Sequence, residues 1–405
     1  MRSLVIAQDF PWPVTRGSHL RLDAVIRELV DLGETDLFAL LPARRREPCE
    51  VPEGLSIRKV STATQPNPPL SLRTRARWVM SRLPLEVSGR RVPNAELLRM
   101  GPNPYDLVWV GRAETFEVLG RPRLGPTVVD IDDLEDWKIL SRLRAMGLGR
   151  NDRVASMHDR GVLMQARLNA RRWRRLQRSV AAEVERAGVC SELDLERFGM
   201  PNGILIPNGY EAPDFPAGRD EVGARPTLLL VGNFCYPPNS DAARWLVTEV
   251  LPILRRDIPD VEVRLVGEPD TSVALLAAHR SVTVVGQVPE MHSELLRADV
   301  IAVPVRFGSG TRIKILEAFA NRIPVVSTTT GAEGLSVENG RELLLADDAP
   351  SFARSCALLI SDTPTRRALA DAAQLLFLER YQWSAVRGHV RRVALEVGRK
   401  TFEDA

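Results

Sequence analysis

The segment from Arg306 to Glu317 combines residue types that could bind a phosphate group. It reads Arg-Phe-Gly-Ser-Gly-Thr-Arg-Ile-Lys-Ile-Leu-Glu, and it follows an apolar run that predicts a buried strand. Glycines let backbone N–H groups approach an anion closely, and the start of a helix favours negative charge. Arg312 and Lys314 place positive charge in the first turn, where the helix dipole alone disfavours it. The segment therefore predicts an anion-binding turn between a strand and a helix.

Glu317 follows further along the same predicted helix and could accept hydrogen bonds from two ribose hydroxyls. The simpler interpretation is a tight turn in which Lys314 and Glu317 form an exposed pair, worth roughly a few tenths of a kcal/mol. A glycine turn alone is a weak indication of a ligand site. The glycines, the two cations and the downstream acid together favour binding of a nucleotide.

A run of acids from Asp130 to Asp136 follows the apolar stretch Thr127 to Ile131. Open α/β sheets bind ligands at the carboxyl ends of their strands, where Asp130 and Asp132 would lie. They could bind substrate hydroxyls or an amine-bearing substrate. The equally weighted alternative is a capping cluster for the next helix.

The loop from Pro11 to Arg21 is a second candidate, because it follows the first predicted strand. Gly17 allows a close backbone approach, and His19 and Arg21 stand at the start of a predicted helix. The alternative is an ordinary helix cap with exposed polar side chains. The clustering of His, Gly and Arg directly after a strand favours a functional role.

These residues need two α/β domains to position them. The 405 residues are 44% hydrophobic, enough for two cores, and strand-like runs alternate with helical patterns in both halves, which indicates mostly parallel sheets. We expect an N-terminal domain over 1–208, a second domain over 209–383, and a C-terminal helix (384–405) that packs back on the first. Residues 134–187 are predicted to be helical and are very basic. Residues 42–104 show no regular pattern.

Composition excludes several classes of protein. With 55 basic and 52 acidic residues the net charge is +3, which gives no reason to expect a nucleic-acid partner. The four cysteines form no C-x-x-C pair, which is typical of a reducing compartment and argues against structural zinc. No apolar run approaches the length of a membrane span and the N-terminus does not resemble a signal peptide, so we expect a cytoplasmic protein.

Taken with its neighbours, the Arg306–Glu317 segment resembles the donor-binding motif of retaining GT-B glycosyltransferases of the family 4 type (glycosyltransferase group 1). The likeness covers essentially the whole second domain and is weaker over the first, where it rests on the Gly17 loop and Cys190-Ser191-Glu192. The other matching pieces, in chain order, are Pro207-Asn208-Gly209, Val231-Gly232-Asn233 with Pro238-Asn239, Leu265-Val266-Gly267, Gly286-Gln287-Val288-Pro289, Pro324 to Thr328, Gly331 to Leu335, and Trp383.

The resemblance implies roles for individual residues. Gly232, its following loop and Gly267 would approach the donor phosphates or sugar, Val288 would meet the base, and Glu317 would bind the ribose. The pyrophosphate would be cradled by Gly308, Ser309, Gly310 and Thr311. The Gly17 loop with His19 would touch the donor phosphate or the acceptor.

Two departures from the family pattern shift the expected phosphate contacts. Asn233 and Asn239 stand where many members carry an Arg and a Lys, and Ser309 stands where many carry a Glu. We therefore assign the neutralisation of the diphosphate to Arg312 and Lys314, with Arg306 in reserve.

The resulting prediction is a GT-B enzyme of the hexosyltransferase type. It would move a sugar from a nucleoside-diphosphate sugar, UDP more than dTDP or GDP, to an acceptor hydroxyl, with retention and without a metal or other cofactor. Asp130, Asp132 and His19 would act on the acceptor side, where the carboxylates could also stabilise an oxocarbenium-like transition state. The acceptor would be a small natural-product or saccharide intermediate.

Three alternatives stay open: a sugar-nucleotide epimerase on the same fold, a non-catalytic sugar-nucleotide-binding protein, and a transferase for a lipid-linked acceptor at the membrane. The last depends on the basic run Arg171–Arg178. That run could dock on an anionic membrane, although an ordinary solvated helix face with Trp173, Leu176 and Val180 turned to the core is favoured.

Overall fold

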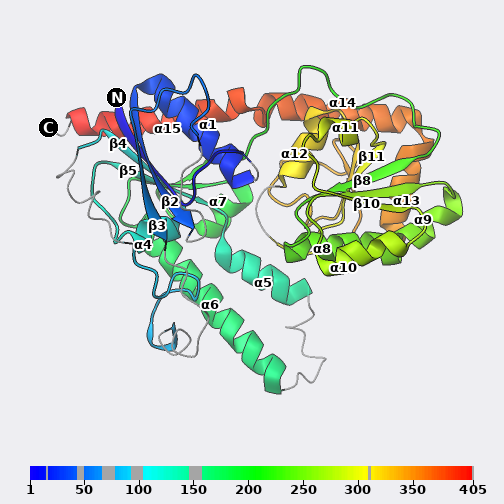
Figure 1. The fold of residues 1–405 in the computed structure, drawn as a ribbon, viewed down its shortest axis with the longest axis horizontal. Helices are drawn as coiled ribbons and strands as arrows, with labels where there is room; N and C mark the ends of the chain where they lie inside the picture. Colours follow the sequence, from blue (N-terminus) through cyan, green and yellow to red (C-terminus); the bar gives the residue numbers. More distant parts are fainter. Residues whose placement is uncertain are drawn as a thin grey trace. The chain divides into compact units, whose positions relative to one another are not determined.

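The computed structural model describes residues 1–14, 17–42, 50–65, 78–92, 104–145, 157–308 and 312–403. The chain divides into two compact units, Met1–Asn208 with Val386–Ala405, and Gly209–Ala385. Each unit contains one parallel sheet with helices packed against it (Figure 1). The predicted α/β class with two Rossmann-like sheets is confirmed.

The sheet of the first unit has seven strands in the order β3-β2-β1-β4-β5-β6-β7, and every neighbouring pair is parallel. The order reverses between β1 and β4, which creates a switch point where the connections leave in opposite directions. The strands are β1 Arg2–Ala7, β2 Glu34–Pro42, β3 Lys59–Gln65, β4 Leu107–Gly111, β5 Thr127–Asp132, β6 Arg186–Val189 and β7 Gly203–Leu205.

Helices cover both faces of this sheet. They are α1 Gly17–Leu32, α4 Ala113–Val118, α5 Glu135–Ala145, α6 Met157–Ala181, α7 Glu192–Phe198 and the last helix, α15 Trp383–Glu403. Val390, Val393 and Val397 of α15 join the same buried cluster as Val25 of α1 and Val5 of β1. The final helix therefore completes one core of the first unit.

The sheet of the second unit has six parallel strands in the order β10-β9-β8-β11-β12-β13, with its switch point between β8 and β11. The strands are β8 Thr227–Val231, β9 Glu262–Val266, β10 Val282–Gly286, β11 Val300–Val303, β12 Val325–Ser327 and β13 Leu344–Leu345. The helices are α8 Pro237–Trp245, η1 Leu246–Val250, α9 Leu251–Asp257, α10 Thr271–Ala274, η2 Leu275–Ala278, α11 His292–Leu295, α12 Ile313–Ala320, α13 Ala349–Ser361 and α14 Thr363–Arg380.

The edge strands β3 and β13 were not predicted. The helical region predicted over 134–187 contains the helices α5 and α6 and, at its end, the start of β6. Among the described residues, no helix is both long and apolar enough to cross a membrane.

Candidate active site

A cavity of about 350 Å³ opens at the switch point of the first sheet. Its polar lining comes from the ends of β1, β4 and β5 and from the first turn of α1, and it includes Asp9, His19, Arg21, Arg112, Asp130 and Asp132. This is the position where open α/β sheets bind ligands. The structure thus brings the predicted residues His19, Asp130 and Asp132 together around one cavity.

Arg21 and Asp130 form a buried ion pair at the base of this cavity. Arg21 Nε and Nη2 donate to the two carboxylate oxygens of Asp130, both at 2.7 Å. Arg21 Nη1 also donates to the carbonyls of Ile206 and Pro207 and to Asn208 Oδ1. Burial opposes ionisation, yet the Asp130 carboxylate raises the pKa of Arg21 above its ordinary value. Both Asp130 oxygens are therefore committed to Arg21.

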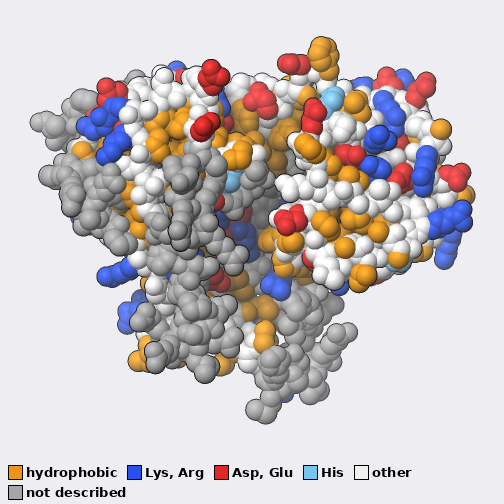
Figure 2. All heavy atoms as spheres, in the orientation of Figure 1, with side chains coloured by type: hydrophobic (Ala, Val, Ile, Leu, Met, Phe, Trp, Pro, Cys, Tyr) orange, Lys and Arg blue, Asp and Glu red, His pale blue; other side chains and the backbone are white. Residues whose placement is uncertain are grey.

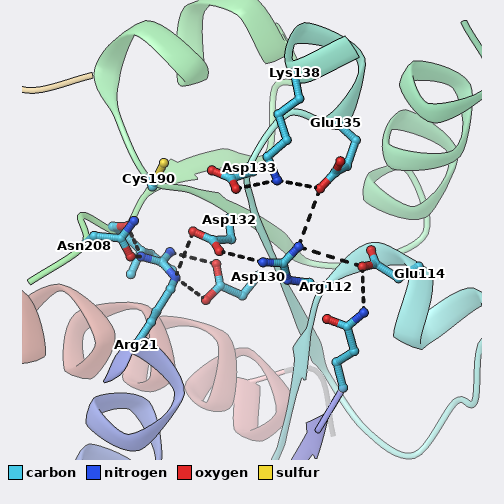
Figure 3. A network of polar contacts seen from close by, with 12 residues as sticks. Arg21, Arg112, Glu114, Asp130, Asp132, Asp133, Glu135, Lys138, Cys190 and Asn208 are labelled. Carbon is cyan, nitrogen blue, oxygen red and sulfur yellow. Dashed lines mark hydrogen bonds and ion pairs between the residues drawn. The ribbon is translucent and has the colours of Figure 1, made fainter. Parts of the chain in front are cut away.

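Arg112 forms the second cationic centre of the cavity (Figure 3). It follows β4 with a φ of 75°, and its guanidinium lies 3.4 Å from Asp132, 3.5 Å from Glu135 and 4.0 Å from Glu114. Glu114 in turn accepts a hydrogen bond of 3.1 Å from Gln8 Nε2. Arg112 thus ties the ends of β1, β4 and β5 into one polar network.

Asp132 contacts the two guanidinium groups at longer distances than Asp130 contacts Arg21. It lies 3.9 Å from Arg21 Nε and 3.4 Å from Arg112 Nη2. Burial raises the pKa of Asp132, and the neighbouring Asp133 carboxylate raises it further. Burial also raises the pKa of Glu114. Asp132 can therefore take up or share a proton more readily than an exposed carboxylate.

One cluster near the cavity has metal-ligand chemistry. Ligand atoms of Asp132, Asp133 and Cys190 lie within 4.8 Å of one another. The Lys138 ammonium, however, lies 2.7 Å from Asp133 and 2.8 Å from Glu135 (Figure 3). Burial and the surrounding carboxylates raise the pKa of Cys190 well above its ordinary value, which keeps it a thiol rather than the thiolate that binds metals. The expectation that no metal takes part stays a prediction.

His19 also lines the cavity, from the first turn of α1, which begins at Gly17. Its Nδ1 is 3.3 Å from the Pro13 carbonyl, and its Nε2 is 3.8 Å from Asp9. The ring is buried, so its position is fixed at the cavity wall. Within the first unit, His19 is thus a neighbour of Asp9.

In the second unit, four predicted donor residues meet beyond the end of β8: Gly232, Asn233, Asn239 and Lys314. Lys314 Nζ, in the first turn of α12, donates to Asn239 Oδ1 at 2.9 Å. Asn239 Nδ2 donates to the Asn233 carbonyl at 2.9 Å. Gly232 lies against Asn239 and Lys314, because a Cβ at position 232 would stand 2.8 Å from Asn239 Nδ2 and 3.0 Å from Lys314 Nζ. An asparagine thus holds the lysine in place.

Burial and, to a smaller extent, the adjacent Arg312 lower the pKa of Lys314 to about 7, while Glu317 opposes the change. A buried ammonium beside another cation is costly unless an anion is bound nearby. Arg312 is the N-cap of α12, and its guanidinium lies against Gly308, where a Cβ would stand 2.7 Å from Nη2. Arg312, Lys314 and the start of α12 thus concentrate positive charge at one place.

Glu317 lies one turn further along α12 and is buried. Its Oε1 accepts a hydrogen bond of 2.7 Å from the Tyr210 hydroxyl. Burial raises the pKa of Glu317, and this hydrogen bond works in the opposite direction. Tyr210 itself is held by backbone hydrogen bonds to Tyr381 and Trp383. One oxygen of Glu317 is therefore fixed by a tyrosine that the sequence analysis did not identify.

The remaining predicted donor residues have varied placements. Gly267 has a φ of 130°, and its Cβ would stand 2.0 Å from the Gly232 carbonyl, so only glycine fits between β9 and the Gly232 loop. Val288 is half-buried beyond β10.

Arg306 pairs with Asp241 through two hydrogen bonds of 2.7 and 2.9 Å, which makes it a weaker candidate for binding the diphosphate. The predicted pyrophosphate loop residues Ser309, Gly310 and Thr311 lie outside the described residues.

Sequence reasoning missed Arg112, Lys138 and Tyr210. Arg112 follows the predicted strand Leu107 to Val110, so the rule that ligands bind at strand ends could have found it. Lys138 follows the acidic run at helical spacing. No local signal marks Tyr210, since its partner Glu317 is 107 residues away.

Comparison with known proteins finds a family that part of the chain matches. Residues 225–362 match the model of the family glycosyl transferases group 1. An uncharacterized 44.6 kDa protein in the cps region of Klebsiella pneumoniae is 26% identical over 174 residues. That match spans 40% of this chain and only 43% of the relative.

Solved GT-B structures share the whole fold. Sucrose-phosphate synthase from Thermosynechococcus elongatus has a TM-score of 0.69 at 18% identity and covers 100% of both chains. Anabaena HepE has a TM-score of 0.63 at 15% identity, with 96% of this chain and 98% of HepE covered. The predicted GT-B fold is confirmed, and residues 225–362 of the second unit match the group 1 glycosyltransferase family.

Proposed function

We propose that the protein transfers a sugar from a nucleoside-diphosphate sugar, bound by the second unit, to an acceptor hydroxyl bound by the first. The observation that carries this is the cluster of Gly232, Asn239 and Lys314 beside the start of α12, within the group 1 glycosyltransferase domain. A close-packed glycine, a lysine held by an amide and a helix N-terminus form a site suited to a diphosphate.

UDP is the nucleotide we favour. Structures of HepE are described with UDP, with UDP and glucose, and with UDP-glucose, and TarM of S. aureus is described with UDP. The Tyr210–Glu317 pair leaves the second oxygen of Glu317 for a ribose hydroxyl. The base would lie near Val288.

The cavity of the first unit is the proposed acceptor site. Asp132 and His19 are its candidate groups for an acceptor hydroxyl, while Asp130 would act indirectly by holding Arg21. Its paired cations and carboxylates provide many hydrogen-bonding groups, which suits a polyhydroxylated or amine-bearing acceptor. We propose that the reaction retains configuration and that the leaving diphosphate, stabilised by Arg312 and Lys314, helps to deprotonate the acceptor.

The first test is binding of UDP, GDP and dTDP by thermal shift and isothermal titration calorimetry. A ligand that binds only the folded state stabilises it by mass action, by about 2.7 kcal/mol at a hundred times its Kd. We expect UDP to give the largest shift and Lys314→Met to reduce it. Arg306→Met is the matched control, because that cation is already paired with Asp241. Equal losses in both variants would contradict the assignment of Lys314.

Transfer is tested by incubating each stabilising nucleotide sugar with and without a panel of saccharide acceptors. Release of the nucleoside diphosphate together with a glycosylated acceptor supports the proposal. Conversion of the sugar nucleotide without acceptor would instead indicate an epimerase. Tight binding without turnover across the panel would indicate a non-catalytic binding protein.

A further inference from the structure

Helix α6 carries a basic and apolar surface that the proposed reaction does not use. From Arg160 to Ala181 the helix contains no acidic residue and seven arginines: Arg160, Arg167, Arg171, Arg172, Arg174, Arg175 and Arg178. The whole chain has a net charge of only +3, so this is a local concentration of positive charge. Figure 1 shows α6 as a long helix whose N-terminal part extends away from the sheet of the first unit.

The contacts of these arginines divide them into two groups. Arg172 stacks over the Trp78 ring at 4.5 Å, Arg174 lies 3.1 Å from Asp136, and Arg178 donates to the Phe198 carbonyl. These three are engaged inside the first unit. Four others, Arg160, Arg167, Arg171 and Arg175, form no ion pair with any described residue, and all four are exposed.

The four exposed arginines share one face of α6 with exposed apolar side chains. Positions 160, 164, 167, 168, 171 and 175 follow helical spacing and form a single stripe. Met164 in this stripe is 73% exposed, and Leu168 is also exposed. The opposite face carries Trp173, Leu176 and Val180, which are buried in the core of the first unit. The stripe therefore points away from the protein body.

A neighbouring turn extends the apolar part of this surface. Arg172 donates to the carbonyls of Trp78 and Val79, which holds the turn against α6. Met80 in that turn is 86% exposed and Val79 is 61% exposed. Met164 and Leu168 thus lie among four arginines without an ion pair to a described residue, and Val79 and Met80 lie on the segment that Arg172 holds against α6. Exposed apolar and cationic side chains together are the composition by which a protein surface enters a lipid headgroup region.

We propose that this surface, made of Arg160, Met164, Arg167, Leu168, Arg171 and Arg175 with Val79 and Met80, docks the protein on an anionic lipid bilayer. The arginines would contact lipid phosphates, and the methionines, leucine and valine would enter the acyl boundary. A nucleic acid is the less favoured partner because its backbone offers nothing for exposed Met80 and Met164 to contact. The surface keeps Arg171 and Arg175 of the predicted basic run Arg171–Arg178. It leaves out Arg172, Arg174 and Arg178, which have partners in the first unit, and it adds Arg160 and Arg167.

The test is flotation of the full chain with vesicles of phosphatidylcholine alone and of phosphatidylcholine with phosphatidylglycerol. We expect binding only to the anionic vesicles. Each arginine near an anionic surface contributes about fivefold in affinity, so loss of four should weaken binding by about two to three orders of magnitude. The first variant carries Arg160→Gln, Arg167→Gln, Arg171→Gln and Arg175→Gln.

A matched control removes the same charge elsewhere. Four exposed arginines of the second unit also lack ion pairs with described residues, and they are changed together: Arg256→Gln, Arg280→Gln, Arg297→Gln and Arg354→Gln. We expect this variant to keep its vesicle binding within about fivefold. All substitutions are at exposed positions, and circular dichroism checks that each variant is folded. Absence of binding to anionic vesicles, or equal loss in both variants, would overturn the proposal.

A second variant separates apolar insertion from charge. The variant Met80→Ser with Met164→Ser and Leu168→Ser keeps every arginine, so it should still bind at low salt. It should release at a salt concentration at which the wild type stays bound, because only its screened electrostatic contacts remain. If this variant binds like the wild type at every salt concentration, insertion is refuted. Fluorescence anisotropy with a DNA duplex is the counter-assay: duplex binding that depends on the four arginines, without vesicle binding, would identify a nucleic-acid surface instead.

Discussion

Replacing Arg21 with methionine should destabilise the first unit more than any other single change to its ion pairs. The substitution leaves the Asp130 carboxylate buried without its cation, and the Ile206 and Pro207 carbonyls lose a donor. The side chains of Arg21 and Asp130 are only 5% and 7% exposed, so solvent offers little compensation.

The expected cost follows from that burial. Breaking a buried, hydrogen-bonded ion pair by removing one partner costs about 3–5 kcal/mol. For a unit of this size, each kcal/mol of lost stability lowers Tm by about 2–4 °C, so Arg21→Met should lower Tm by about 6–20 °C. Replacing both partners, Arg21→Met with Asp130→Leu, should recover most of the loss, because a well-packed apolar pair removes the uncompensated charge.

Urea and thermal unfolding followed by tryptophan fluorescence measure these differences. The matched control is Arg27→Met on the same helix, because Arg27 pairs with Asp23 at 2.8 Å but its side chain is 43% exposed. That pair should contribute less than about 1 kcal/mol. The reasoning is refuted if Arg21→Met costs no more than Arg27→Met, or if the double variant is as unstable as the single one.

Three further predictions concern the second unit. The pKa of Lys314 is lowered to about 7, so its ammonium is lost as pH rises through 7, and UDP affinity should fall by up to about tenfold per pH unit above pH 7. Calorimetry at several pH values should show a flatter profile for Lys314→Met. A profile equal to that of the wild type would refute a role of Lys314 in binding the diphosphate. Gly267→Ala should destabilise the second unit by several kcal/mol, because the new Cβ would stand 2.0 Å from the Gly232 carbonyl and the φ of residue 267 is 130°. Urea unfolding measures the loss of stability. A loss below about 1 kcal/mol would be incompatible with this close approach of the two backbones. Tyr210→Phe should leave Glu317 with an unpartnered buried oxygen and weaken UDP binding by about tenfold, and calorimetry that finds equal Kd values would show that the hydroxyl does not position Glu317.

The sequence predicted best where local pattern and family motif coincide. The strands β1, β4, β5, β8 and β9 are short apolar runs bounded by polar turns, so their places were recognisable. β3 was missed because Lys-Val-Ser-Thr-Ala-Thr-Gln has few large apolar residues and pairs only with β2 at the edge of the sheet. β13 is only two residues long, too short for any periodicity.

The candidate sites were predictable as residue types but not as networks. Motif order identified Gly232, Asn239 and Lys314, and the structure brings them into contact, while their roles stay predictions. The partner of Asp130 was not foreseen, because the bond to Arg21 joins residues 109 positions apart. Ion pairing of this kind is decided by tertiary packing. It also changes the role expected of Asp130, whose two oxygens are already occupied.

The last helix has a consequence for synthesis on the ribosome. Its residues from Val386 onward belong to the first unit, and Arg387 and Arg391 pair with Glu28 of α1. The whole second unit must therefore be translated before the first can bury the apolar face that Val390 and Val397 cover. At about 5–20 residues per second this delay lasts on the order of 10–35 s. The second unit is contiguous, so a nascent chain can complete it while the older half still waits for its final helix.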